Sequence, residues 1–391
     1  GELRGSQGKG FAILAEADSS PTLARLKAQF IETYPEATWV EYEPLSRDSE
    51  LVGTKAAFGT PLRTQLHLDK AHVIVSLEAD LFGDHPTALR NTRHFAEGRD
   101  PKGDMNRLYV AESCFTITGA AADHRLPVRS SQIGAFVAAI EAKLAGEPAD
   151  AEATWQKYLD AIVDDLEHHH GKSVLVAGPS QPAEVHAAVH RINAQLDNIG
   201  RTLTYTEDPA PERPSHIDAI GQIVEQINSG DVDTLLVLGG NPVYDAPADL
   251  QFADAFAKVA TRIHLSLDDN ETSQTATWHL PRAHFLETWG DARGYDGTYS
   301  IVQPMIEPLW EGRSKIEVLA RLIDSDSNAY EQVRETARDI AGKEDFETRW
   351  QVALHDGILN DSRGAPITPK PEDVSDTRLP SKPDAGDFEV I

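Results

Sequence analysis

The sequence predicts an α/β protein built from two similar units, with mainly parallel sheets covered by helices on both faces. Two observations carry this prediction. Short β-rich runs alternate with longer segments of helical period along most of the 391 residues, a pattern typical of parallel strands joined by helices. A strand–helix–strand unit also occurs twice, which indicates a structural repeat.

The individual elements follow from residue type and period. Short apolar and β-branched runs predict strands at 11–15, 38–42, 73–77, 108–112, 173–177, 234–238 and 262–267. Longer periodic segments predict helices at 22–34, 86–95, 131–144, 153–168, 182–197, 216–229, 249–259, 315–323 and 330–357. Residues 45–66 have no clear period and are expected to be loop with some helix. Residues 358–391, rich in Pro, Asp and Ser, are expected to be an extended or disordered tail.

The repeat is defined by its order and by its endings. In each copy a strand, a proline-led helix and a second strand lead to a Leu-Pro pair, Leu126-Pro127 in the first copy and Leu280-Pro281 in the second. The first copy is longer, which fits an insertion in its polar loop at 97–106. The alternative is a chance similarity between two ordinary strand–helix–strand units.

The composition is strongly acidic. There are 63 Asp and Glu against 36 Lys and Arg, a formal net charge of −27. Such a surface repels nucleic acid and anionic membranes, so neither is expected as a partner. It indicates adaptation to high salt, where the repulsion between carboxylates is screened; an ordinary acidic protein is the alternative. The apolar runs reach only strand length, so no direct membrane insertion is expected.

The chain offers no cysteine-held metal site. Cys114 is its one cysteine, which excludes an internal disulfide, a cysteine-ligated zinc ion and an iron–sulfur cluster within these residues. We expect Cys114 to be a small buried residue rather than a nucleophile. His168–His170 precede a glycine at a helix end, where imidazoles suit the helix dipole and solvent. No metal ligands are therefore predicted.

A glycine-rich turn is the first candidate for ligand binding. Gly239, Gly240 and Asn241 follow the strand at 234–238, and the carboxyl ends of parallel strands are where α/β sheets bind ligands. Glycine and asparagine tolerate positive φ, so backbone N–H groups there can converge on a phosphate. The alternative is a plain tight turn, since the sequence is not the GxGxxG dinucleotide fingerprint.

Two further segments combine charged and aromatic residues. Residues 123–129 hold acid–base and cationic groups, which we interpret as the solvated charges of a strand end. Residues 287–299 form a loop of glycine, aromatic and charged residues. Ordered packing at a domain edge explains this loop, and a ligand-facing role is the alternative.

The order of these segments resembles the molybdopterin oxidoreductases of the dimethyl-sulfoxide-reductase superfamily. The resemblance covers roughly residues 8–325 and includes a loop ending at His85-Pro86 and the later series LLVLGGNP (235–242), WHLP (278–281), FLE (285–287), DGT (296–298), Gln303 and Glu307-Pro308. A narrower similarity, to the B subunit of alternative complex III, is carried by VGTKAAFG (52–59), SLEADLFGDHP (76–86), MNRLYVAES (105–113) and ETWGDARGYDGTYSIVQP (287–304).

The resemblance implies a function as well as a fold. In that family a molybdopterin-oxidoreductase-like part without the molybdenum cofactor is joined to a ferredoxin-like iron–sulfur part. The complex oxidises quinol at a bacterial membrane and passes electrons to a periplasmic carrier. The implied partners are the other subunits of the complex and the iron–sulfur domain, and the implied location is the periplasmic face of the inner membrane.

Departures from the superfamily pattern favour a chain without cofactor. The span where molybdenum enzymes of this superfamily carry their metal ligand corresponds to 44–68, which contains no cysteine. The resemblance also implies two interleaved, doubly wound domains, which we place at 1–45 with 170–325 and at 46–169. Residues 326–391 would be a helix and extended tail at the start of a missing C-terminal region.

These observations leave three hypotheses about function. The first is a non-catalytic, cofactor-free scaffold within an electron-transfer subunit. The second is a true molybdopterin-dependent oxidoreductase that binds pterin guanine dinucleotides between its domains. Its candidate cofactor-binding residues are His85 and Gly239, Gly240 and Asn241, at the phosphates. The third is a two-lobed protein that binds a small ligand, a class that would not predict the series DGT, Gln303 and Glu307-Pro308 at 296–308.

Overall fold

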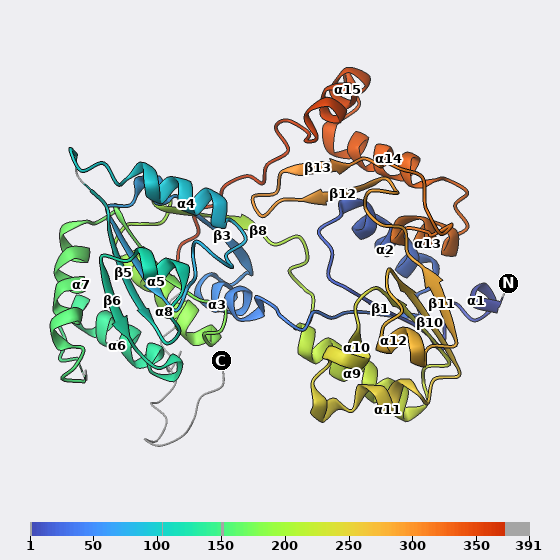
Figure 1. Ribbon diagram of the computed structural model, residues 1–391, viewed down its shortest axis with the longest axis horizontal. Coiled ribbons are helices and arrows are strands. Elements are labelled where there is room, and N and C mark those ends of the chain that lie inside the picture. The colour runs from blue at the N-terminus through green and yellow to red at the C-terminus, as the bar shows by residue number, and fades with distance from the viewer. Residues whose placement is uncertain (1, 104, 150–151, 372–391) are drawn as a thin grey trace. The chain divides into compact units, whose positions relative to one another are not determined.

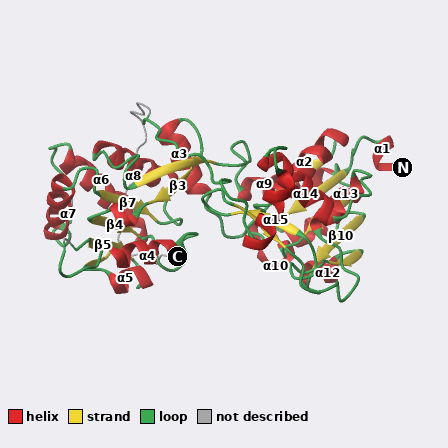
Figure 2. Cartoon of the chain, turned by 90° about the horizontal axis from the view of Figure 1, so that it is seen from above, coloured by secondary structure: helices red, strands yellow, loops and turns green. Residues whose placement is uncertain are grey.

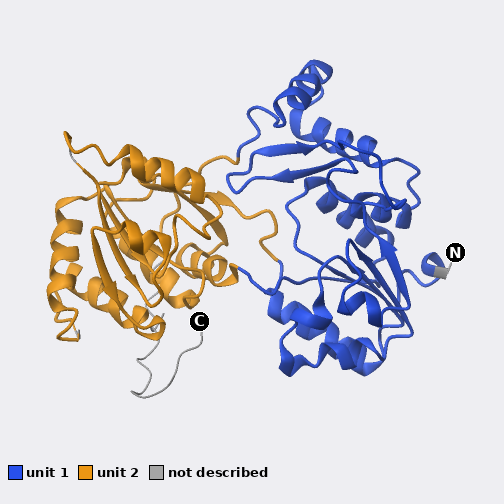
Figure 3. Ribbon diagram, in the orientation of Figure 1, with its two compact units in different colours: residues 1–46, 213–363 blue, residues 47–212, 364–391 orange. Residues whose placement is uncertain are grey.

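The computed structural model describes residues 2–103, 105–149 and 152–371 (Figure 1). The chain divides into two compact units, coloured separately in Figure 3. Unit 1 contains the residues up to Ser46 together with Arg213–Arg363. Unit 2 contains Arg47–Glu212 and the described residues from Gly364 onward. The chain therefore leaves unit 1, forms unit 2 and returns, as an interleaved topology requires.

Unit 1 is built around a five-stranded parallel sheet. Its strand order is β11-β10-β9-β1-β2. The strands are β1 (Phe11–Ala15), β2 (Thr38–Glu41), β9 (Thr234–Leu238), β10 (Thr261–Ser266) and β11 (Trp278–Pro281). A separate antiparallel pair joins β12 (Gly290–Arg293) to β13 (Tyr299–Val302).

Successive side chains of the unit 1 strands point to opposite faces of the sheet, and each face packs against its own set of helices. Phe11 and Ile13 pack with the apolar residues of α2 (Pro21–Thr33), α13 (Lys315–Leu322), α14 (Ala329–Ala341) and α15 (Phe346–Asp356). Ala12 and Leu14 face the opposite way, toward α9 (His216–Ser229) and α11 (Phe252–Phe256). Burial on both faces explains why β1 and β9, in the middle of this sheet, are almost continuously apolar. The short helices are α1 (Glu2–Gly5), α10 (Pro242–Asp245) and α12 (Glu271–Thr275).

Unit 2 contains a four-stranded parallel sheet of order β6-β5-β4-β7. Its strands are β4 (Val73–Leu77), β5 (Arg107–Glu112), β6 (His124–Pro127) and β7 (Ser173–Ala177). One face packs against α6 (Ile133–Leu144), α7 (Gln156–His168) and α8 (Ala183–Gln195). The other face meets α3 (Asp48–Phe58), α4 (Ala88–Glu97) and the antiparallel pair β3 (Leu62–Leu66) and β8 (Leu203–Glu207). The short α5 (Ile117–Ala121) follows β5. Figure 2 shows helices on both sides of the strands in each unit.

The repeat expected from the sequence is present in the strand order. β4, β5 and β6 lie side by side in unit 2, as β9, β10 and β11 do in unit 1. Leu126-Pro127 and Leu280-Pro281 end the third strand of each series. A fourth parallel strand, β7 in unit 2 and β1 in unit 1, pairs with the first strand of the series. The predicted α/β class with mainly parallel sheets is confirmed.

Two of the expected domain boundaries need correction. The resemblance predicts that residues 170–212 belong to the domain of the glycine-rich turn, but β7 pairs with β4 and lies in unit 2. Its Val174 and Leu175 fill the two cores of that unit, a long-range pairing that the sequence order does not reveal. Residues 326–363 do not form a separate region either, because α14 and α15 pack into the core of unit 1. Ile367 then bridges to Tyr205 in unit 2, and 372–391 lie outside the described residues.

Candidate functional site

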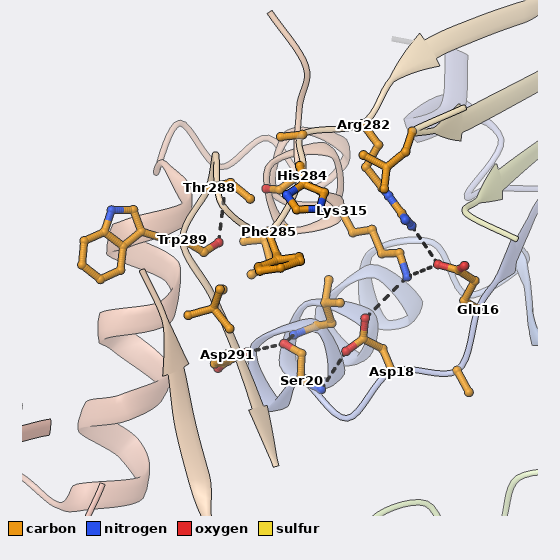
Figure 4. A pocket seen from close by; sticks show the side chains of 18 of the residues that line it. Glu16, Asp18, Ser20, Arg282, His284, Phe285, Thr288, Trp289, Asp291 and Lys315 are labelled. Atoms are coloured by element: carbon orange, nitrogen blue, oxygen red, sulfur yellow. Dashed lines mark hydrogen bonds and ion pairs between the residues drawn. The ribbon is translucent and has the colours of Figure 1, made fainter. Parts of the chain in front are cut away.

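The strand order of unit 1 creates a topological switch point between β1 and β9. From these neighbouring strands the chain continues outward in opposite directions, to β2 on one side and to β10 and β11 on the other. In open α/β sheets ligands bind outside the carboxyl ends of the strands at this place. A pocket of about 580 Å³ lies there, lined by residues that follow β1, β2, β10 and β11, by β12 and by the start of α13 (Figure 4).

Glu16 is the central charged residue of this pocket. It follows β1, and its Oε2 lies 2.8 Å from Arg282 Nη1 and 2.8 Å from Lys315 Nζ. Both cations point toward this carboxylate in Figure 4. Burial alone would raise the pKa of Glu16, but the charges and hydrogen bonds of Lys315 and Arg282 outweigh burial and hold the pKa below its ordinary value. Glu16 is therefore ionised and paired at neutral pH.

The glycine-rich turn lies at the same switch point, after β9. Gly239 and Gly240 have φ of 87° and 73°, as expected for residues that must adopt positive φ. A Cβ on Gly239 would lie only 2.1 Å from Glu16 Oε2, so glycine is needed there for space as well. The Gly239 N–H donates to the carbonyl of Leu265 at 3.0 Å.

Asn241 is also engaged within the chain. Its side-chain amide donates to Glu271 Oε2 at 2.6 Å, and its Oδ1 accepts from the N–H and the hydroxyl of Thr272. These contacts connect the turn to α12. The structure thus brings the predicted residues of the turn to the switch point, with the Gly239 N–H and the Asn241 amide already bonded to the chain's own groups.

His85, the fourth predicted binding residue, belongs to unit 2. Its Nδ1 accepts a hydrogen bond from the backbone N–H of Thr87 at 3.1 Å and lies 3.2 Å from Asn91 Nδ2. Burial, together with the charges of Arg47 and Arg90, lowers the pKa of His85 to about 3. The imidazole is therefore neutral and organises the loop before α4.

Two further carboxylates that line the pocket of unit 1 accept hydrogen bonds from neutral donors. Asp291 on β12 accepts from the hydroxyls of Ser20, Thr22 and Tyr299. Burial raises the pKa of Asp291, although these donors act against the rise. Glu43 accepts from the Ala17 N–H at 3.0 Å, and burial followed by repulsion from Glu16 raises the pKa of Glu43.

The corresponding neighbouring strand ends of unit 2 are those of β4 and β7, although β7 is the edge strand of its sheet and the chain does not continue outward from both strands as it does in unit 1. Glu78 follows β4 with φ of 57°, and its carboxylate accepts from the hydroxyls of Ser113 and Ser130 and from Gln181 Nε2. Gly178 follows β7, and a Cβ on it would lie 1.9 Å from the carbonyl oxygen of Glu78. A glutamate and a glycine thus meet at both pairs of strand ends.

The remaining sequence candidates carry less chemistry. Cys114 is exposed, contrary to expectation, because it lies in the loop between β5 and α5 rather than in a strand. Of the charges at 123–129, Asp123 pairs with Arg99 and Arg125 with Glu112. Within the described ranges no group of three or more His, Cys, Asp and Glu could hold a metal ion. In the same ranges no helix combines the length and the apolar character needed to cross a membrane.

Sequence reasoning missed Glu16 and Glu78 at these strand ends, and it missed the two cations of unit 1. One signal was available, because the strands FAILA and VIVSL are each followed directly by a glutamate. An acidic residue just beyond a continuously buried strand marks the carboxyl end of that strand. Without the strand order, however, nothing in the sequence says which of these strand ends lies at a switch point.

Comparison with known proteins identifies the fold. No family model and no curated protein matches the sequence. Acetylene hydratase from Pelobacter acetylenicus has a similar structure, with a TM-score of 0.59 and 10% identity over 85% of this chain and 58% of that one. A chain of the formyltransferase/hydrolase complex FhcABCD from Methylorubrum extorquens, solved with methylofuran, has a TM-score of 0.56 and 16% identity over 82% of this chain and 92% of that one. The chain therefore has an α/β fold of the acetylene hydratase type and spans little more than half of the acetylene hydratase chain.

Proposed function

We propose that this chain is the α/β core of a molybdopterin-oxidoreductase-like, iron–sulfur subunit of a membrane complex that oxidises quinol, of the alternative complex III type. In this role it is a scaffold without bound pterin at the periplasmic face of a bacterial inner membrane. The fold shared with acetylene hydratase, a molybdopterin enzyme, and the motif series from Leu235 to Glu307 support the family. The carboxylate of Glu16 beside Gly239 is the observation that supports the scaffold role.

A pterin dinucleotide would require donors or positive charge for its phosphates at the switch point. Gly239 instead faces the negative oxygen of Glu16, and its N–H is bonded to Leu265. The amide of Asn241 is bonded to Glu271. As arranged, these residues do not fit a pyrophosphate group at the turn.

An exposed apolar surface on unit 1 supports association with a protein partner. Phe285, Met305, Leu309 and Trp310 are 61%, 76%, 69% and 80% exposed. The N–H groups of Met305 and Ile306 both donate to the carbonyl of Leu286, which holds the two segments together. Clusters of exposed aromatic and aliphatic side chains mark protein interfaces. Glu307 and Glu311 at this surface are exposed, so a partner with an apolar centre and basic margin would fit.

Metal and pterin analysis of the full-length protein from its native source tests the scaffold role. We expect neither molybdenum nor tungsten nor pterin at stoichiometric amounts, and copurification with a multihaem cytochrome and a polytopic membrane subunit. Stoichiometric metal with pterin would overturn the scaffold role and favour a molybdopterin-dependent enzyme. Purification without membrane subunits would overturn the assignment to a quinol-oxidising complex.

The apolar surface provides a second test. Trp310→Ser in the native complex should leave stability within about 0.5 kcal/mol, as is usual for exposed positions, and should release the chain from the membrane subunits. Tyr244→Ser is the matched control, since Tyr244 is 75% exposed elsewhere on unit 1. Equal copurification of both variants would show that this surface does not hold the complex together.

A further inference from the structure

Two cations of unit 1 converge on a single carboxylate oxygen. Arg282 follows β11, Lys315 is the first residue of α13, and each lies 2.8 Å from Glu16 Oε2. Their side chains are only 21% and 13% exposed. Two cations that are largely removed from water require an anion between them, since an unpaired buried charge is costly.

Lys315 lies at the start of α13, next to the N-cap Ser314. The first turn of a helix carries partial positive charge, which favours an anion there. Glu317 supplies that anion in a capping box, since its Oε2 accepts from the N–H of Ser314 at 2.9 Å and from the Ser314 hydroxyl at 3.1 Å. Lys315 Nζ is paired instead with Glu16 Oε2 and, at 3.5 Å, with Asp18 Oδ2. A lysine and an arginine that meet at one carboxylate oxygen are residue types that bind phosphate groups in proteins.

Glu16 occupies the position at which doubly wound sheets hold a bound ligand. It lies outside the carboxyl ends of β1 and β9, where doubly wound sheets hold the anionic group of a ligand. Its carboxylate fills space that exists only because Gly239 lacks a side chain. The adjoining pocket of about 580 Å³ is large enough for a small molecule.

We propose that Arg282 and Lys315 form a binding site for a phosphate or pyrophosphate group, and that Glu16 occupies this site from within the chain. The carboxylate competes with any external phosphate at the high effective concentration of an attached group. The native protein is therefore closed to phosphate ligands at this position, although the cations that would bind them remain. This inference shares the Glu16 carboxylate with the scaffold proposal and specifies what the site would take.

The test is pyrophosphate binding by the full chain, measured by calorimetry at low ionic strength. Glu16→Ala should bind inorganic pyrophosphate about tenfold more tightly than the wild type, because it exposes two charge-assisted donors. Pyrophosphate should also raise the thermal unfolding midpoint of Glu16→Ala and leave that of the wild type unchanged. Glu78→Ala is the matched control, because it removes the corresponding glutamate of unit 2, which accepts from the neutral donors of Ser113, Ser130 and Gln181.

Two further variants keep the test decisive. Glu16→Gln retains an acceptor for Arg282 and removes the charge, so it serves if Glu16→Ala does not fold, and it should also gain affinity. Glu16→Ala with Lys315→Met should lose the gain. The proposal is overturned if neither Glu16 variant binds more tightly than the wild type, if the gain survives loss of Lys315, or if Glu78→Ala gains equally through net charge alone. None of these outcomes alters the metal and pterin content of the native protein, which tests the scaffold role separately.

Discussion

Two pairs of neighbouring strand ends, β1 with β9 in unit 1 and β4 with β7 in unit 2, carry the same two residue types on exchanged strands. In unit 1 the glutamate follows β1 and the glycine follows β9, the first strand of the β9-β10-β11 series. In unit 2 Glu78 follows β4, the first strand of the β4-β5-β6 series, and Gly178 follows the added strand β7. What the two units share is a close approach between two strand ends, and either strand can supply the glycine.

The partners of the two glutamates differ in charge. Glu16 is paired with a lysine and an arginine, whereas Glu78 accepts hydrogen bonds from two serines and a glutamine. Neutral donors can satisfy a carboxylate without leaving a positive site behind when it is removed. The comparison therefore shows that unit 1 combines two features of an anion site, a switch point in the strand order and two cations, whereas Glu78 in unit 2 accepts from neutral donors at strand ends that are not a switch point.

The largest expected effect is that of Gly178→Ala. Its Cβ would lie 1.9 Å from the backbone oxygen of Glu78, and backbone cannot rotate away, so we expect a loss of about 3 kcal/mol, at the high end for overpacking.

Gly239→Ala should cost less, about 2 kcal/mol, because the Glu16 side chain can move and the φ of 87° adds only moderate strain. Urea unfolding followed by hydrogen exchange in β4 and β9 measures both. A larger loss for Gly239→Ala would show that backbone strain outweighs the close approach.

Lys315→Met comes next, and its effect should depend on pH. At pH 7 it leaves the largely buried Glu16 with one cation, and we expect a loss of about 2 kcal/mol, below the value for a fully buried pair. Because the folded-state pKa of Glu16 is lowered, the stability from this pair is present above the unfolded pKa and is lost as pH falls through the folded one. The difference between variant and wild type in urea unfolding should therefore shrink below about pH 4. An equal difference at pH 7 and pH 3 would mean that Lys315 acts by packing alone.

Glu78→Gln should have a smaller effect. The glutamine side chain keeps one acceptor oxygen for the donors of Ser113, Ser130 and Gln181, and the loss should be about 1 kcal/mol, typical of one hydrogen bond. Urea unfolding at pH 7 gives the value. A loss greater than that of Lys315→Met would show that charge matters as much in unit 2 as in unit 1 and would end the distinction between the two sites.

The sequence predicts the parts of this fold that depend on local pattern. The strands at 73–77, 173–177 and 234–238 are placed correctly because they are continuously apolar and bounded by polar turns. The positive φ of Gly239 and Gly240 follows from residue type. The Leu-Pro endings reveal the repeat, since they mark the third strand of each series.

The local sequence pattern does not predict features that depend on pairing between distant segments of the chain. β7 is apolar enough to suit either sheet, and only its pairing with β4 assigns it to unit 2. β3 and β8 are separated by more than 130 residues, pair with each other, and contain polar residues such as Gln65 and Thr204 that hide the strand pattern. The contacts of Glu16 with Arg282 and Lys315 join residues about 270 and 300 positions apart in the chain, so no local motif contains them.

The smallest expected effect is that of Glu43→Gln. Glu43 follows β2, an outer strand of the unit 1 sheet that has no counterpart beyond β7 among the described strands of unit 2. β2 brings Glu43 to the carboxyl edge of the unit 1 sheet, where burial and then the charge of Glu16 raise the pKa of Glu43. An acid with a raised folded-state pKa costs stability once it is ionised, and this cost is absent below the unfolded pKa. Glu43→Gln keeps an acceptor for the Ala17 N–H and should therefore stabilise the protein at pH 7 by no more than about 0.5 kcal/mol, since solvent screens a half-exposed group. The gain in urea unfolding should vanish near pH 4. A loss of stability at pH 7 would instead show that Glu43 attracts Lys315 more than Glu16 repels it, so that the charge balance of the site would include β2.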